Sequence, residues 1–374
     1  MFLDLSKAFD TVDKNILTQK LSSYGFGENV IKLLNNYMSG RKMFIPNQKI
    51  INETKTINNL ELGVPQGSTL GPLLFILYVN DIGDVEDKSS MIMYADDTTI
   101  VVSDKCIKSA EKHANAVMRK IYTYFCTNKL SINTSKTKYM VFSPHIRKKE
   151  KIHCKIVLNN VEVERVSEFK FLGVMIDESL NWKKHKLYIA SKIVRNIGIL
   201  YKSRHVLNYT ELLNMYNSFI LPYLLYCLPA WGGSITSKSD PIIKVQNRII
   251  RVLTFKTRTF EARDIVRSDI LDIQNLYKIE VTKIAYDFFN FKLPTPTNNI
   301  FKISSSETNK YNTRSSTRLN LFKPICKTIR DENRFYNKCT IIWNNVPYPL
   351  KLSLTKAKFV ENFTTVVKEN NFSN

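Results

Sequence analysis

Two adjacent aspartates, Asp96 and Asp97, are the strongest chemical signal in this sequence. Strand-forming residues flank them on both sides, which predicts a tight hairpin with both carboxylates at its tip. Adjacent carboxylates raise each other's pKa unless a cation compensates their charge. A third acid, Asp4, lies in another strand-like run, from Phe2 to Leu5. Three carboxylates on neighbouring strands would form a two-metal site for phosphoryl transfer. The alternative for Asp96 and Asp97 is a solvated acidic turn.

The elements that must position these acids alternate between short strands and helices over the first 178 residues, which predicts an α+β fold. We expect Asn159 and Asn160 to form a hairpin turn. We also expect an amphipathic helix from Ile107 to Phe125, because its apolar residues recur at helical spacing. The other predicted helices are 15–36, interrupted near Gly25 and Gly27, and 72–81; the predicted strands are 2–5, 43–45, 55–58, 138–142, 155–158, 161–166 and 168–176.

From Trp182 onward the pattern becomes helical. Apolar residues form a stripe at Ile189, Ile193, Ile197 and Leu200, with Lys184, Lys186, Lys192 and Arg195 largely off it. Further helices are predicted over 241–254 and 257–293, followed by a polar segment and a small packed C-terminal unit. The uncharged run 212–237 is long enough to span a bilayer. Its prolines and glycines instead favour a buried helix and turn, and we expect no membrane association.

The charge balance points to a polyanionic partner. The chain of 374 residues has 55 Lys and Arg against 33 Asp and Glu, a net charge of +22. Nucleic acid is the simplest partner for such a surplus. The alternative is generic solubility or a codon bias toward Lys. Six scattered cysteines have no paired spacing, so they indicate an intracellular protein without a disulfide framework or zinc site.

Several motifs occur in a fixed order along the chain. The segments Asp4–Asp10, Gly63–Ser68 and Tyr94–Asp97 resemble motifs A, B and C of the reverse transcriptases of non-LTR (LINE-type) retrotransposons. Leu130–Thr137 and Phe169–Val174 look like their motifs D and E. Further similarity covers Tyr216–Pro222, Trp231–Gly232 and Trp343–Pro347. A lone Asp-Asp pair would be weak support, whereas five ordered motifs are specific.

The resemblance implies the right-hand polymerase fold and its chemistry. The palm, an antiparallel sheet with helices, would comprise residues 1–178, and a helical thumb and connection would comprise 179–293. A polar linker over 294–318 would lead to a C-terminal helical unit over 319–374. The implied reaction is RNA-directed DNA synthesis from dNTPs on an RNA template with a DNA primer. Two Mg²⁺ ions, with Mn²⁺ as an alternative, would serve it.

The same resemblance assigns the metal ligands. Asp4 would bridge both ions, and the Leu5 carbonyl would help to bind the ion on the nucleotide side. Asp96 would hold the catalytic ion, and Asp97 would complete the acidic field. Lys136 would protonate the departing pyrophosphate, unless it is simply a solvated lysine.

Four further residues would contact the substrates. Phe9 would be a steric gate against the ribose 2′-hydroxyl, or else a plain core residue. Gln66 and Gly67 would lie near the template and the incoming nucleotide, unless their loop merely caps a helix. Gly173 would permit the tight hairpin that braces the primer end.

Reverse transcriptases carry a fingers region before motif A, whereas here Met1 lies three residues before Asp4. We therefore expect a chain without fingers, from a truncated or a degenerate element. That expectation leaves two alternatives to polymerase activity: a remnant that only binds nucleic acid, and a two-metal nuclease. The template RNA, the insertion target and the oligomeric state are not encoded in these motifs.

Overall fold

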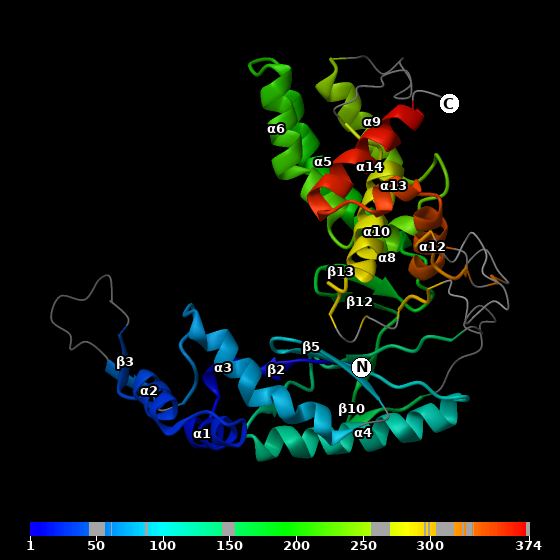
Figure 1. Cartoon of the computed structure of the whole chain (residues 1–374). Helices are drawn as coiled ribbons and strands as arrows, with labels where there is room; N and C mark the ends of the chain where they lie inside the picture. Colours follow the sequence, from blue (N-terminus) through cyan, green and yellow to red (C-terminus); the bar gives the residue numbers. More distant parts are fainter. Residues whose placement is uncertain are drawn as a thin grey trace. The chain divides into compact units, whose positions relative to one another are not determined.

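A computed structural model divides the chain into two units, Met1–Glu168 and Phe169–Asn374, each with its own apolar core (Figure 1). The backbone is described for residues 1–44, 57–60, 62–86, 89–143, 154–255, 270–294, 297, 300–303, 318–323, 325–326, 331 and 333–371. Most of the predicted polar linker, the start of the helix predicted over 257–293 and part of the strand predicted over 55–58 lie outside these residues.

A five-stranded sheet forms the centre of the first unit. Its strand order is β11 (Glu164–Arg165), β8 (Lys138–Tyr139), β1 (Phe2–Leu3), β6 (Asp97–Val101) and β5 (Ser90–Tyr94). The β8–β1, β1–β6 and β6–β5 pairs are antiparallel, as predicted. The β11–β8 pair is parallel, so this edge of the sheet differs from the predicted antiparallel arrangement.

Three smaller strand pairs accompany the sheet in the first unit. They are β2 (Leu5–Ser6) with β7 (Ser131–Ile132), β3 (Arg41–Phe44) with β4 (Ile57–Leu60), and β9 (Val157–Leu158) with β10 (Val161–Glu162). The last pair confirms the predicted turn, because Asn159 and Asn160 have φ values of 46° and 61°. Asn adopts the left-handed region more readily than most residues, which suits it to such turns.

The helices of the first unit are α1 (Lys14–Ser23), α2 (Glu28–Met38), α3 (Leu70–Val79) and α4 (Ile107–Thr127), with the 3₁₀ helices η1 (Ala8–Asp10) and η2 (Asn80–Val85). The side chain of Asp13 begins α1 by accepting hydrogen bonds from two backbone N–H groups. Gly25, with φ of 84°, separates α1 from α2 at the predicted interruption. The α4 face predicted to be apolar is buried at Ala114, Val117, Met118, Ile121 and Phe125.

The second unit begins with a hairpin of β12 (Glu168–Phe171) and β13 (Val174–Asp177), followed by helices. The predicted apolar stripe of α5 is buried, whereas Lys186, expected off the stripe, is also buried. The helices are α5 (Lys183–Ser203), α6 (Tyr209–Phe219), α7 (Leu221–Leu225), α8 (Leu228–Trp231), α9 (Pro241–Leu253), α10 (Ile273–Phe289), α12 (Phe335–Asn344), α13 (Tyr348–Lys351) and α14 (Lys356–Asn371), and the 3₁₀ helix η4 is Gly232–Ser234.

The uncharged run 212–237 folds as α6, α7, α8 and η4, consistent with the predicted buried helix and turn. None of the helices that the structure describes combines the length and apolarity needed to cross a membrane. The core of this unit also includes Trp343 of α12 and Phe359 of α14, both fully buried. Trp343 stacks on Phe289 of α10, with ring centroids 5.4 Å apart.

Candidate active site

The β5–β6 hairpin places two acids at its tip, as the sequence predicted. Tyr94 pairs with Asp97 across the hairpin, so Ala95 and Asp96 form a two-residue loop. Asp97 is the first residue of β6. Ala95 has a φ of 53°, a left-handed conformation that favours glycine. The tight loop therefore fixes the spacing of the two carboxylates at the cost of backbone strain.

Asp4 reaches the same end of the sheet through the pairing of β1. The β1–β6 register pairs Phe2 with Thr99 and Leu3 with Thr98, so the next step brings Asp4 opposite Asp97. On the other side of β1, Phe2 pairs with Lys138. Antiparallel continuation of that pair brings Asp4 toward Lys136, whose Nζ lies 3.5 Å from Asp4 Oδ2. Strand register thus gathers Asp4, Asp97 and Lys136.

The carboxylates act on one another electrostatically. The pKa of Asp97 is raised, first by burial and then by the negative charges of Asp96 and Asp4. Such a shift means that the ionised cluster is unfavourable without a compensating positive charge. Lys136 is the basic side chain paired with Asp4.

The oxygen donors of this cluster are those that Mg²⁺ prefers, and their mutual repulsion favours a cation between them. Across the described residues, however, no three His, Cys, Asp or Glu side chains are already grouped as metal ligands. Leu5, the predicted carbonyl ligand, lies in β2 and pairs with Ile132 of β7. The donor chemistry fits the predicted ions, and the ligand geometry stays a prediction.

The loop that contains Gln66 and Gly67 packs against the segment after Asp4. The backbone N–H of Val64 donates to the Phe9 carbonyl at 2.8 Å, and Gln66 Nε2 donates to Asp10 Oδ1 at 2.7 Å. A β-carbon on Gly63 would lie 2.9 Å from backbone atoms of Asp10, so only glycine fits there. Gly67 has a φ of 76°, which again suits glycine.

The hydrogen bond between Gln66 and Asp10 was not predicted from the sequence. The two motifs are adjacent in three dimensions because η1 and the loop run side by side. No spacing rule links positions so far apart in the chain.

Phe9 lies in η1 and is partly buried. Its ring centroid is 4.8 Å from that of Phe75, a fully buried residue of α3. This packing is what the core alternative expects, and it also gives a gating ring a firm support. Both interpretations of Phe9 therefore stay open.

Gly173 belongs to the second unit and lies in the two-residue turn between β12 and β13. Its φ is 84°, and that of the preceding Leu172 is 44°. The predicted tight hairpin is therefore present, and glycine occupies a position that L residues rarely adopt. Its role toward a primer stays a prediction.

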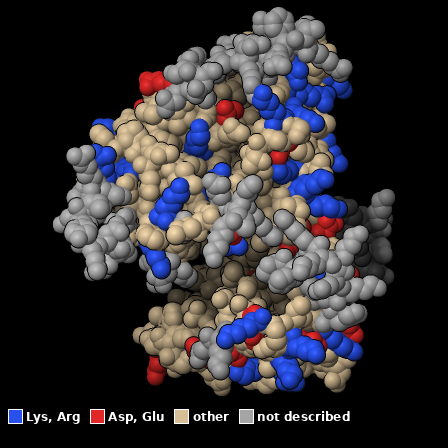
Figure 2. Space-filling model, turned by 90° about the vertical axis from the view of Figure 1, so that its right-hand side faces the viewer, with Lys and Arg blue, Asp and Glu red and all other residues tan. Residues whose placement is uncertain are grey.

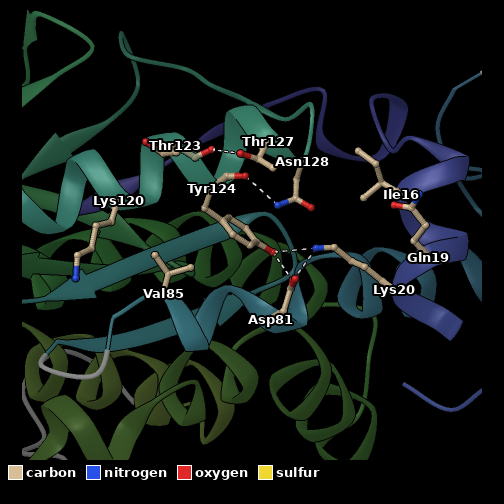
Figure 3. A pocket seen from close by; sticks show the side chains of 10 residues that line it. All are labelled: Ile16, Gln19, Lys20, Asp81, Val85, Lys120, Thr123, Tyr124, Thr127 and Asn128. Atoms are coloured by element: carbon tan, nitrogen blue, oxygen red, sulfur yellow. Dashed lines mark hydrogen bonds and ion pairs between the residues drawn. The ribbon is translucent and has the colours of Figure 1, made fainter. Parts of the chain in front are cut away.

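A separate cavity of about 670 Å³ is lined by α1, η2 and α4 and holds none of the predicted site residues (Figure 3). Lys20 donates to Asp81 Oδ1 at 2.7 Å, to the Tyr78 carbonyl at 2.7 Å and to the Tyr124 hydroxyl at 3.3 Å. Tyr124 donates to the same Asp81 oxygen. These bonds occupy all three ammonium protons, so the network ties four elements of the first unit together: α1, α3, η2 and α4.

Comparison with known proteins finds a family match for the N-terminal part of the chain. Residues 1–176 match the sequence model of a family described as reverse transcriptase (RNA-dependent DNA polymerase). This match covers the whole of the first unit and most of the β12–β13 hairpin that follows it.

The similar proteins come from transposable elements. A probable RNA-directed DNA polymerase from the transposon X-element of Drosophila melanogaster is 27% identical, over 73% of this chain and 30% of that protein. The RNA-directed DNA polymerase from the mobile element jockey of Drosophila funebris is 25% identical, over 71% of this chain and 29% of that protein. The chain thus spans less than a third of the length of these relatives. It is similar to the RNA-directed DNA polymerases of these transposable elements, and its residues 1–176 match the reverse transcriptase family.

Proposed function

We propose that this chain carries out RNA-directed DNA synthesis at the Asp4, Asp96 and Asp97 carboxylates, extending a DNA primer on an RNA template. The observation that carries the proposal is the strand register that gathers Asp4 and Asp97 next to Asp96, within a domain of the reverse transcriptase family. The raised pKa of Asp97 supports it, because a divalent cation would relieve that repulsion.

In the proposed reaction the three aspartates would hold Mg²⁺, and the bound ions would lower the pKa of the primer 3′-hydroxyl and stabilise the charge on the leaving oxygen. Lys136 lies beside Asp4 and carries protons that it can give to the departing pyrophosphate. Gln66 is hydrogen-bonded to Asp10, which lies six residues after Asp4 in the sequence. That bond would hold the loop close to the carboxylates. A nucleotide and its template base would lie between the loop and the carboxylates.

Residues 1–178, which are the first unit and the β12–β13 hairpin of the second, would form the palm, and residues 179–293 would form the thumb and connection. Exposed basic side chains on α5 and α9 suit contacts with a nucleic-acid backbone: Lys183, Lys184, Arg195, Lys244 and Arg248. Figure 2 shows Lys and Arg side chains on both units, and the net charge of the chain is +22. Lys186 is excluded from this set because it is buried against Asp240.

Primer extension on an RNA template with Mg²⁺ and dNTPs is the direct test. We expect Asp96→Asn to abolish incorporation, while Asp104→Asn, an exposed acid outside the cluster, keeps it. Equal incorporation by Asp96→Asn and the unaltered chain would rule out the proposed role. Omitting the dNTPs tests the nuclease alternative, which requires cleavage of the nucleic acid under those conditions.

The second candidate function is a protein that binds nucleic acid without catalysis, and the charge of +22 favours it. It predicts binding to an RNA–DNA duplex that weakens steeply with salt, together with no incorporation. The proposed polymerase also binds with salt dependence, so incorporation is the measurement that separates the two candidates.

A further inference from the structure

The turn between β12 and β13 has an unusual backbone. Leu172 and Gly173, its two central residues, have φ values of 44° and 84°. Two-residue hairpin turns with two left-handed residues prefer Asn, Asp or Gly at both positions. A leucine in that region is disfavoured, so something outside the hairpin has to hold its tip.

Tyr226 is the residue that contacts this tip. Its hydroxyl donates a hydrogen bond to the Leu172 carbonyl, with the two oxygens 2.6 Å apart. Its ring lies over Gly173, because a β-carbon added there would be 3.3 Å from Tyr226 Cε1. One side chain therefore holds the turn through its carbonyl and also occupies the space above its glycine.

Tyr226 is itself fixed to the helical core of the second unit. It follows α7 and precedes α8, and its carbonyl accepts a hydrogen bond from Trp231 Nε1 at 3.0 Å. Trp231 is fully buried. The strand after the turn has a separate attachment, because the backbone N–H of Met175 donates to His185 Nδ1 at 3.2 Å. The strand is thus docked on α5, and Tyr226 contacts the tip.

We propose that Tyr226 is a positioning residue that holds the Leu172–Gly173 tip where the terminal nucleotide of a primer is braced. The inference rests on the proposed function, because it assigns the hairpin to the primer end. Tyr226 acts through the hairpin and touches no substrate. Its loss leaves phosphate contacts elsewhere in the chain intact, so duplex affinity is retained while placement of the primer terminus is impaired.

The test uses the full chain and a DNA primer with a photoreactive thiothymidine at its 3′ end, annealed to an RNA template. Tyr226→Phe removes only the hydroxyl, and Tyr223→Phe is its control, since Tyr223 lies on α7 with 40% exposure. We expect cross-linking of the primer end to residues 168–177 to fall about 2- to 10-fold in Tyr226→Phe, the equivalent of one hydrogen bond. Tyr223→Phe should match the unaltered chain.

The affinity for primer–template should change less than about twofold in Tyr226→Phe, since one exposed hydroxyl contributes little to a charged interface. A merely structural role would change affinity and cross-linking together. Unchanged cross-linking in Tyr226→Phe, an equal fall in Tyr223→Phe, or no cross-link to 168–177 in the unaltered chain would each overturn the inference. Cross-linking needs no nucleotide incorporation, so a chain that binds but never extends a primer would refute the polymerase proposal alone.

Discussion

Lys136 Nζ and Asp4 Oδ2 lie 3.5 Å apart because β1 pairs with β8 in an antiparallel register. Their side chains retain 68% and 32% exposure, so the ion pair contributes little to stability. Because the pair contributes little to folding and lies beside the carboxylates of Asp96 and Asp97, its position is better explained by a chemical role than by a structural one. The register that forms it also brings Asp4 opposite Asp97.

Replacing Lys136 with methionine should slow incorporation about 100-fold, because a positioned proton donor contributes at least that much to a transfer reaction. The free energy of unfolding should change by less than about 1 kcal/mol, since the pair is exposed. Single-turnover incorporation and chemical denaturation check the two statements. Lys138→Met is the control, because Lys138 pairs with Glu164 instead. Full activity in Lys136→Met would show that Lys136 is a solvated lysine and not the proton donor.

Replacing Asp97 with asparagine should raise the melting temperature at about pH 7 while removing activity. The pKa of Asp97 is raised in the folded chain by burial, Asp96 and Asp4. Folding is therefore opposed once the pH rises through that pKa and the carboxyl ionises. The gain should shrink in acid, where the carboxyl is neutral, and in about 1 M salt, which screens the repulsion. Thermal melts across pH and salt decide this, and a lower melting temperature in dilute buffer at neutral pH would contradict the proposed repulsion.

Local patterns predicted the elements well where each residue's environment follows from its neighbours in sequence. The apolar spacing of α4 and the Asn159–Asn160 turn are examples, and so is the acidic hairpin. The sequence did not reveal contacts made between distant segments. Lys186 was expected to lie off the buried face of α5, yet it is buried because Asp240 arrives from another helix.

The same limit applies to the candidate site. The order of the motifs suggested that Asp4 and the Asp96–Asp97 pair belong together, but the bond between Gln66 and Asp10 depends on how two loops pack. The hydrogen bond from Tyr226 to Leu172 depends on a residue between α7 and α8, 54 positions later in the chain. Tertiary contacts of this kind carry no periodic signal.

The Lys186–Asp240 pair should be important for the stability of the second unit. Its nitrogen and oxygen are 2.7 Å apart, and the side chains are 10% and 5% exposed. Asp240 also accepts from the Ile242 N–H at the start of α9. Asn can keep that capping bond but not the charge, so Asp240→Asn should cost about 3 kcal/mol by leaving Lys186 unpaired.

The matched control for Asp240→Asn is Asp272→Asn. Asp272 caps α10 through the Asn275 N–H, and none of the ion pairs among the described residues involves it. Asparagine and aspartate are equivalent caps, so this variant should stay within about 0.5 kcal/mol of the unaltered chain. Urea denaturation measures both variants. Equal losses would assign the effect of Asp240 to capping and not to the buried charge.

The second unit should lose stability in acid through His185. This side chain is fully buried, and its ring lies 5.2 Å from that of Trp231. Burial lowers its pKa to about 4, from an ordinary value of 6.5. As the pH falls below 6.5 the unfolded chain takes up the proton first, so folding weakens until the folded-state pKa is reached. The loss should approach about 3 kcal/mol by pH 4.

Protonation also removes the lone pair of Nδ1 that accepts the Met175 N–H, so the β13 strand loses its attachment to α5 in the same step. Denaturation midpoints between about pH 7 and pH 4 should fall less steeply in His185→Gln than in the unaltered chain, because glutamine does not titrate. His205→Gln is the control, since His205 is exposed. This variant should show the same dependence of the denaturation midpoint on pH as the unaltered chain. If His185→Gln retained that full slope, the acid sensitivity would belong to other groups.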